Sequence, residues 1–326
     1  MSPKIIVVFG ATGQQGGSVV ASFLKNKDYI VRAVTRNPEG DKAKALSANG
    51  AQVVAADLND YPSLVKAFQG ASAAFGVTDF WTLVPTTGTD GAFNGEIQQG
   101  KNLAKAAAAT PTLEHYVWSS LPSSTAASHG AISVPHIDSK AHVDEYIISS
   151  LPDLAMKTTF FWAGFYATNL GYFMPPIKQE SGKYAWALPC KSSAAAPMMG
   201  LTSANVGVFV SAILAKPEIT LPSKYVLGSV ETLTMGQVLE LWGEVNGVDT
   251  VYVQKGLEDY EASFPAGPVF GKELGLNMKF FEFGMDGWAK KGEGILTKED
   301  LGIKDAALVN TKKTFERMDW SSIVRA

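Results

Sequence analysis

The chain has 326 residues, which is enough for one large core or for a core with a dependent lobe, so we expect one to two domains. Its 28 basic and 31 acidic residues nearly cancel and form no basic cluster, which argues against a nucleic-acid-binding surface. The one cysteine, Cys190, excludes an internal disulfide and a thiolate metal site, and it suits a reducing compartment. The longest apolar stretch, Val206–Ala215, is too short to cross a bilayer, so we expect a cytoplasmic protein with no membrane partner.

The most informative segment is Val7–Gly17, where three glycines follow an apolar β-branched run and open a helix-compatible stretch. Gly10 lets the chain turn sharply, Gly13 leaves room for a pyrophosphate, and Gly16 lets the helix approach the sheet. A tight turn without a ligand is the alternative, but strand, turn and helix in register favour dinucleotide binding. We therefore expect this loop to bind the cofactor through Gly10, Thr12, Gly13, Gln15 and Gly16.

The end of the second predicted strand, Tyr29–Thr35, indicates which dinucleotide is bound. An NAD site would place an acid here to accept from the ribose 2′-hydroxyl, whereas this chain has Arg36 and Asn37. A guanidinium can bind a 2′-phosphate and stack on adenine, so we predict NADP(H). The alternative is a solvated arginine in a loop.

Strand-like and helix-like runs alternate through the first half of the chain. The strand-like runs are 5–9, 29–35, 52–56, 73–78 and 115–119, and the helix-like runs are 14–27, 42–49, 61–69 and 95–109. This repeated βαβ pattern predicts an α/β fold with a doubly wound parallel Rossmann sheet, with ligands at the carboxyl ends of the strands.

Polar residues follow several of these strand ends. Asp57 and Leu58 suit the adenine amine and ring, although Asp57 could equally cap the next turn. Thr78 ends the fourth strand and is included in the predicted cofactor site. Ser119 and Ser120 end the fifth strand and could bond a substrate carbonyl, although serine is also an ordinary turn residue there.

After Leu151 the alternation decays, and helical spacing returns at 203–215, 235–245 and 266–288. No Gly/Ser-rich or charged hinge separates the two halves. We predict an NADP(H)-binding Rossmann domain over 1–160 and a smaller C-terminal α/β lobe over 161–326. This lobe would not fold independently, and the chain could cross back between the two.

Six short motifs, taken in chain order, resemble those of the NmrA-like proteins, which are atypical members of the short-chain dehydrogenase/reductase superfamily. The motifs are Phe9–Gly17, Val34–Pro38, Val77–Trp81, Gln98–Lys101, Val117–Ser120 and His136–Lys140. The resemblance implies NADP(H) binding through the glycine loop, Arg36 and Lys140. It also implies one of two roles: nitrogen-repression regulators or redox sensors that bind dinucleotide without turnover, or reductases of fungal small-molecule pathways.

His136 and Lys140 lie four residues apart at the start of a helix-like stretch and so project from one face. In the parent superfamily this spacing is Tyr-x-x-x-Lys, which implies that Lys140 holds the nicotinamide ribose and that His136 replaces the proton-donating tyrosine. An imidazole can serve as a general acid or base. Alternatively, Lys140 pairs with Asp144 and His136 is a loop residue.

An aromatic segment follows the next strand, and Gly164–Asn169 should run beside the nicotinamide, with cofactor contacts from Phe165, Tyr166 and Asn169. Any one of these aromatics could belong to the core. Together they suggest an apolar substrate pocket formed by Phe80, Trp81, Trp162, Phe165 and Tyr166.

Two functions follow from these features. The first is an NADPH-dependent reductase, or a redox-assisted biosynthetic enzyme of secondary metabolism, that acts on an apolar or heterocyclic small molecule. Its candidate catalytic residues are Lys140, His136, Ser119 and Ser120. The second is a non-catalytic NADP(H) redox sensor or transcriptional regulator that acts through a protein partner. The histidines have no companions at metal-ligand spacing, so we expect no metal.

Overall fold

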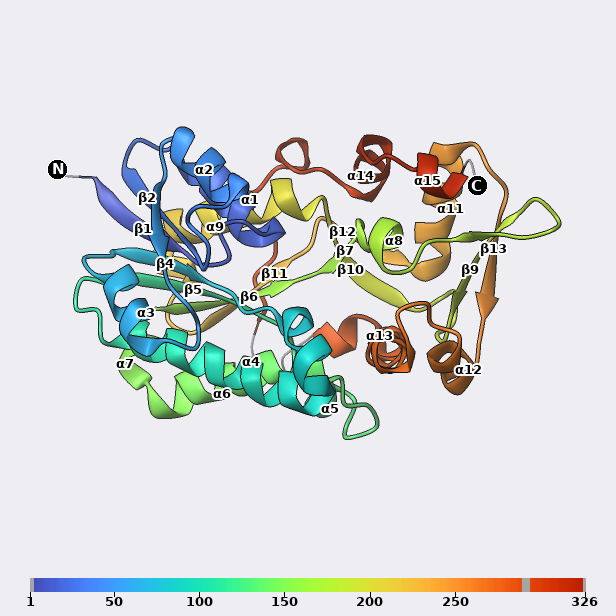
Figure 1. The fold of residues 1–326 in the computed structure, drawn as a ribbon, viewed down its shortest axis with the longest axis horizontal. Helices are drawn as coiled ribbons and strands as arrows, with labels where there is room; N and C mark the ends of the chain where they lie inside the picture. Colours follow the sequence, from blue (N-terminus) through green and yellow to red (C-terminus); the bar gives the residue numbers. More distant parts are fainter. Residues whose placement is uncertain (1–2, 289–293, 325–326) are drawn as a thin grey trace.

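The computed structural model describes residues 3–288 and 294–324. Seven strands form the central sheet: β1 Lys4–Val8, β2 Tyr29–Thr35, β3 Gln52–Ala55, β4 Ala73–Gly76, β5 His115–Ser120, β6 Thr158–Ala163 and β11 Lys224–Gly228. Their order is β11-β6-β5-β4-β1-β2-β3, and every neighbouring pair is parallel (Figure 1). The predicted doubly wound parallel sheet is confirmed, with the first five strands close to their predicted bounds.

Helices cover both faces of this sheet (Figure 1). One face carries α1 Gln14–Phe23, α2 Asp41–Ala48 and α9 Thr202–Ala215, and the other carries α3 Tyr61–Phe68, α4 Val84–Ala108 and α6 Pro135–Ser150. Because β-branched and aromatic side chains point to both faces of the buried strands, each face has its own apolar core. One of these cores continues into the second lobe, where it contains Cys190, and burial raises the pKa of the Cys190 thiol to about 11.

The helix α4 begins earlier than the predicted 95–109 segment. Its first turns contain Thr86 and Thr87, whose hydroxyls donate to the carbonyl of Leu83, and Gly88 at φ 67° interrupts the helical backbone. Threonine and glycine are poor helix formers, so these turns carry no clear helical pattern in the sequence.

The second lobe has two three-stranded sheets. One contains β7 Phe165–Tyr166, β10 Ala195–Gly200 and β12 Glu231–Thr234, and the other contains β8 Ile177–Lys178, β9 Tyr184–Leu188 and β13 Thr250–Gln254. Its longer helices are α11 Met235–Asn246, α12 Leu257–Ala262, α13 Pro268–Phe280 and α14 Thr311–Arg317. The predicted 266–288 helix is α13 followed by a 3₁₀ segment, η2 Phe281–Trp288, which Gly284 interrupts at φ 58°.

The remaining elements are short connections. They are η1 Phe80–Thr82, α5 Ser124–Ala127, α7 Pro152–Ala155, α8 Asn169–Tyr172, α10 Pro217–Thr220, η3 Asp305–Ala307 and α15 Ser321–Val324. No helix among the described residues is long and apolar enough to span a membrane.

After β7 to β10 of the second lobe, the chain crosses back to the first lobe. There α9 packs on α1, and β11 joins the large sheet. A Cβ at Gly207 would lie 2.2 Å from the carbonyl oxygen of Ser18, and the Gly207 amide donates to the Ser18 hydroxyl at 2.9 Å. These contacts place α9 directly against the helix that follows the glycine loop. The strand order reverses between β1 and β4, so the crevice expected of a doubly wound sheet opens between their carboxyl ends.

Candidate functional site

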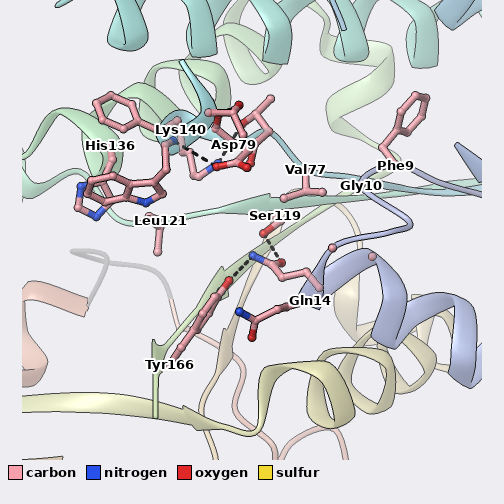
Figure 2. Close-up of a pocket in the computed structure, with 18 of the residues that line it drawn as sticks. Phe9, Gly10, Gln14, Val77, Asp79, Ser119, Leu121, His136, Lys140 and Tyr166 are labelled. Carbon is pink, nitrogen blue, oxygen red and sulfur yellow. Dashed lines mark hydrogen bonds between the residues drawn. The ribbon is translucent and has the colours of Figure 1, made fainter. Parts of the chain in front are cut away.

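A cavity of about 740 Å³ opens at the carboxyl ends of the parallel strands. One end is lined by the glycine loop, Arg36 and Asp57, and the other by side chains of both lobes. Figure 2 shows Lys140 and Asp79 on one side of the cavity and Tyr166 and Gln14 on the other, with Ser119 between them. The predicted site residues that line it are Gly10, Thr12, Gly13, Gln15, Gly16, Arg36, Asn37, Asp57, Leu58, Thr78, Phe80, Trp81, Ser119, Ser120, His136, Lys140, Phe165, Tyr166 and Asn169.

The glycine loop has the geometry that a dinucleotide needs. Gly10 has φ +62°, which only glycine adopts readily, and a Cβ on Gly16 would lie 2.3 Å from the Gly10 carbonyl oxygen. Gly13 is extended and precedes α1 without a side-chain cap, so the first N–H groups of the helix remain open to a ligand. An anion is stabilised at such a helix start, and the loop therefore fits a pyrophosphate.

Arg36 is exposed on the cavity wall, and no described residue forms an ion pair or hydrogen bond with its guanidinium. Its neighbours are instead engaged in the loop. The Thr35 hydroxyl accepts from the Asn37 amide at 3.2 Å, and the Asn37 side-chain oxygen accepts from the Glu39 amide at 3.2 Å. Of these three side chains, Arg36 is the one that carries a positive charge, so it is the one best suited to bind a phosphate.

Asp57 stabilises a turn and also lines the cavity. Its Oδ1 accepts from the backbone amide of Asn59 at 2.8 Å, which stabilises the turn before α3. It also lines the cavity beside Leu58. The turn contact engages one carboxylate oxygen, so the second can face an adenine.

The side chains of Ser119, Gln15 and Tyr166 form a chain of hydrogen bonds across the cavity (Figure 2). The Ser119 hydroxyl donates to Gln15 Oε1 at 2.7 Å, and Gln15 Nε2 donates to the Tyr166 hydroxyl at 2.6 Å. Burial raises the pKa of Tyr166 to about 12, so its phenol stays protonated at neutral pH. Ser120 points elsewhere and donates to Asp144 Oδ1 at 2.6 Å.

Lys140 is a buried cation whose partner is Glu96 on α4. The Nζ donates to Glu96 Oε1 at 2.8 Å and to the Thr78 hydroxyl at 2.9 Å. Glu96, which is fully buried, also accepts from Ser139. Asp144, the alternative partner considered from sequence, instead accepts from the Trp118 indole and from Ser120.

His136 lies at the start of α6 against Glu273 of α13. Glu273 Oε1 accepts from the His136 backbone amide at 2.8 Å and lies 2.6 Å from the imidazole Nδ1. Because the carboxylate can only accept, Nδ1 carries the proton, which leaves Nε2 as the exchangeable atom of a neutral ring. The imidazole also packs 5.0 Å from the Trp81 ring. His136 is therefore held by side chains of both lobes rather than free in a loop.

Asp79 is a cavity residue that the sequence reasoning did not select. Its Oδ1 accepts from the Trp81 amide at 3.2 Å, which caps η1. Solvent in the open cavity reaches the side chain. The surroundings are nevertheless crowded enough that burial raises the pKa of the carboxyl, which Lys140 opposes and Glu96 reinforces.

Aromatic rings enclose the end of the cavity opposite the adenine side. Besides the predicted residues, the wall includes Phe173, Phe281 and Trp288. Trp162 does not belong to it, because this ring is buried in the core against Tyr225, with 5.0 Å between the ring centroids. Trp162 lies within β6, and the part of this segment that lines the cavity begins at Ala163, the last residue of the strand.

Glu96 and Glu273 were also missed from sequence. Each lies on the buried face of its helix, Glu96 with Ala92 and Leu103, and Glu273 with Leu274. A carboxylate on the apolar face of an amphipathic helix indicates that a cation or a hydrogen-bond donor faces it. The sequence pattern therefore predicts that each carboxylate has a partner, but it does not identify which residue the partner is.

Comparison with known proteins agrees with this geometry. The family model described as NmrA-like family matches residues 2–291. An NmrA-like oxidoreductase of Aspergillus japonicus, himF, is 41% identical over 143 residues, which are 43% of this chain and 41% of himF. A second, cpsB of Aspergillus campestris, is 28% identical over 307 residues, which are 87% of this chain and 83% of cpsB. The match thus spans less than half the length of himF but most of cpsB.

Among solved structures, Nmra, a negative transcriptional regulator, is 22% identical to this chain. Its complex with NAD superposes with a TM-score of 0.76 and its complex with NADP with 0.73, each covering 99% of this chain and 97% of that protein. At this identity the likeness shows the fold, an α/β protein with a Rossmann-like sheet and smaller C-terminal sheets.

Proposed function

The chain belongs to the NmrA-like family, and on that premise we propose that it is an NADPH-dependent reductase, or a redox-assisted biosynthetic enzyme, acting on an apolar or heterocyclic small molecule. The observation that carries the proposal is the single cavity that joins the glycine loop and Arg36 to an aromatic end bearing His136 and Lys140. A regulator that only binds the dinucleotide needs the end with the glycine loop and Arg36. An enzyme also needs a compartment for its substrate, and the aromatic end of the cavity provides one.

In this proposal the residues of the first lobe hold the cofactor. The amides at the start of α1 bind the pyrophosphate, Arg36 binds the 2′-phosphate, and Asp57 and Leu58 receive the adenine. Lys140 faces the nicotinamide ribose, while Phe165, Tyr166 and Asn169 form the opposite wall. Bound NADPH supplies a hydride at this end of the cavity.

Three groups at the aromatic end handle the substrate. Ser119 donates a hydrogen bond, and its partner Gln15 keeps it in place. His136 can deliver a proton from Nε2 when its imidazole is doubly protonated, and Glu273, which accepts the Nδ1 proton, keeps the ring in place. Trp81 provides a flat apolar surface beside the imidazole.

The proposal is tested by measuring NADPH oxidation with a panel of ketones, enals and cyclic imines. We expect turnover of at least one class, and we expect Trp81→Ala to raise KM while leaving the Kd of NADPH unchanged. His136→Ala should lower kcat by about 10²- to 10⁴-fold with acceptors that need a proton. An unchanged nicotinamide absorbance across the panel would contradict the proposal.

A cofactor-dependent regulator is the second candidate, favoured by two observations. The superfamily tyrosine is replaced by His136, and Lys140 Nζ already bonds Glu96 and Thr78. A regulator would bind a protein partner with different affinities in its NADPH-bound and NADP⁺-bound forms. Pull-downs with each cofactor form, combined with the turnover panel, separate the two functions.

A further inference from the structure

Charge is unbalanced at the aromatic end of the cavity. The Lys140 ammonium is bonded to Glu96 and the His136 imidazole to Glu273, at 2.8 and 2.6 Å. The third carboxylate is Asp79, and no cation among the described residues forms an ion pair with it. Among the residues that the structure describes, carboxylates therefore outnumber cations at this end of the cavity whichever form the imidazole takes.

The groups around Asp79 are mostly aromatic rings, which stabilise a negative charge less well than water does. Its own helical turn carries Phe80 and Trp81, whose rings meet edge to face with centroids 5.5 Å apart. Phe165, Phe281 and Trp288 line the same compartment. The faces of these rings carry negative electrostatic potential, so they attract cations and do not compensate a carboxylate. Burial raises the pKa of the Asp79 carboxyl even though the charge of Lys140 acts in the opposite direction, so the neighbouring charges do not offset its desolvation.

We propose that this compartment selects a planar cation, with Asp79 as its counter-ion, so that the acceptor in the proposed reduction is an iminium ion in an aromatic or heterocyclic frame. The inference rests on the proposed function and names its substrate class. Asp79 acts in it as a specificity-determining residue that contacts the substrate. The aromatic rings supply the flat walls that favour a delocalised cation.

The reaction balances without a proton donor. The iminium carbon accepts a hydride with its electron pair from NADPH, and the C=N π electrons become the lone pair on nitrogen. The products are a neutral amine and NADP⁺, so the positive charge passes from the substrate to the cofactor. The single negative charge of Asp79 balances this single positive charge before the transfer, on the substrate, and after it, on the cofactor. Because the reduction needs no proton, it does not require the tyrosine of the superfamily.

A carbonyl acceptor fits the same charges poorly. Hydride addition to a ketone leaves an alkoxide, and that oxyanion would develop near the Asp79 carboxylate. Like charges repel, and the surrounding aromatic rings compensate neither of them. The position of Asp79 therefore disfavours neutral carbonyl substrates relative to cations.

The test compares a cation with its neutral isostere. Calorimetry measures the binding of N-methylquinolinium and of its uncharged isostere 1-methylnaphthalene to protein loaded with tetrahydro-NADPH, an analogue whose nicotinamide ring is uncharged and cannot donate hydride. We expect the cation to bind at least about tenfold more tightly, and Asp79→Asn to remove that preference. Asparagine can still accept from the Trp81 amide, so η1 stays capped; Asp79→Ser, which also caps, is the second variant if Asp79→Asn fails to fold.

A parallel measurement follows turnover of N-methyl-dihydroisoquinolinium. Asp79→Asn should lower kcat/KM for this iminium by about tenfold or more, with little change in the Kd of NADPH. Asp90→Asn removes the same charge from an exposed site on α4 outside the cavity and serves as the matched control.

The outcomes separate the two proposals. Cation binding that depends on Asp79, without any NADPH consumption, would support the charge selection and contradict the reductase. Turnover of neutral ketones that Asp79→Asn leaves unchanged would support the reductase and overturn the inference. Equal affinity for N-methylquinolinium in the unmodified protein and in Asp79→Asn would also overturn the inference. The same holds if Asp79→Asn changes the affinity for NADP⁺ and leaves the affinity for N-methylquinolinium unchanged.

Discussion

Lys140 combines a full charge with almost complete burial, so its pairing with Glu96 has consequences for stability. Lys140→Met leaves the fully buried Glu96 without its cation, and we expect a loss of about 3–5 kcal/mol in the free energy of unfolding. Urea denaturation measures it. The double variant Lys140→Met/Glu96→Met should recover part of the loss, because no buried charge remains. A single variant as stable as the unmodified protein would show that the carboxylate finds another partner.

Arg36 presents the cavity with a guanidinium that no described residue engages. We predict that NADPH binds more tightly than NADH and that Arg36→Ala erases most of the difference. A charge-assisted bidentate contact to the phosphate contributes about 2–4 kcal/mol, which is about 30- to 1,000-fold in Kd. Calorimetry with both cofactors tests this, with Lys42→Ala on α2 as the control for loss of a nearby charge. Equal Kd values in the unmodified protein would place the phosphate elsewhere.

Individual site residues could be predicted where a local motif fixes the backbone. The glycine loop and Arg36 are of this kind, because a strand end and a helix start determine where they lie. Trp162 was misplaced because it still lies within β6, and the strand end could not be located from a segment with aromatic residues on both sides of Ala163 and Gly164. Glu96 and Glu273 reach the site from distant helices, and no local pattern indicates which residue they meet.

At the scale of elements, two glycines at the junction of β1 and α1 have different roles, one in NADPH binding and the other in the stability of the apo protein. Gly13→Val places a branched side chain where the backbone meets the pyrophosphate, so NADPH binding should be lost while the apo protein keeps most of its stability. Gly16→Val instead drives a Cβ into the Phe9 and Gly10 carbonyls, which lie within 2.5 Å, and should destabilise the apo protein by about 3 kcal/mol or more. Thermal unfolding without cofactor, followed by NADPH titration, distinguishes them. Normal NADPH binding by Gly13→Val would exclude the loop as the phosphate site.

The start of β5 makes the fold sensitive to acid. His115 Nε2 donates to the Thr159 hydroxyl at 2.7 Å, since that hydroxyl itself donates to the Thr220 carbonyl. Burial lowers the pKa of His115 to about 4, so below about pH 6.5 the unfolded chain takes up a proton that the folded chain refuses. The stability that His115 contributes is complete above about pH 6.5 and is lost progressively as the pH falls towards about 4.

We therefore expect His115 to account for about 2 kcal/mol of lost stability between about pH 7.5 and about pH 5. His115→Gln can keep the donor to Thr159 but does not titrate, so its unfolding free energy should fall less over the same interval. Urea denaturation at the two pH values gives both slopes. Parallel slopes for the two proteins would show that His115 does not control the acid response.

Elements were predictable where they were long and periodic. The first five strands and their helices follow the βαβ pattern closely, whereas the first turns of α4 are masked by threonines and a glycine. Strands such as β7 and β8 have two residues each, which is too short for any alternation to appear.

At the scale of the whole molecule, the cavity depends on both lobes. The glycine loop, Arg36 and Lys140 come from the first lobe, while Phe165, Tyr166 and the helix bearing Glu273 come from the second. The absence of a hinge between the halves predicted a C-terminal lobe that does not fold independently, but the sequence could not place β11 in the large sheet. That strand has five residues and lies far along the chain from its neighbour β6, so only the folded structure reveals the pairing.

A single-turnover experiment with NADPH deuterated at the hydride-donating carbon tests most directly whether this cavity brings the cofactor and an acceptor together. Protein saturated with the labelled cofactor is mixed with N-methyl-dihydroisoquinolinium and with neutral ketones and enals, and the products are examined by mass spectrometry. We predict deuterium on the reduced carbon of at least one product. NADPH that binds tightly but retains all of its deuterium with every acceptor would contradict a reductase and leave the regulator as the function of this fold.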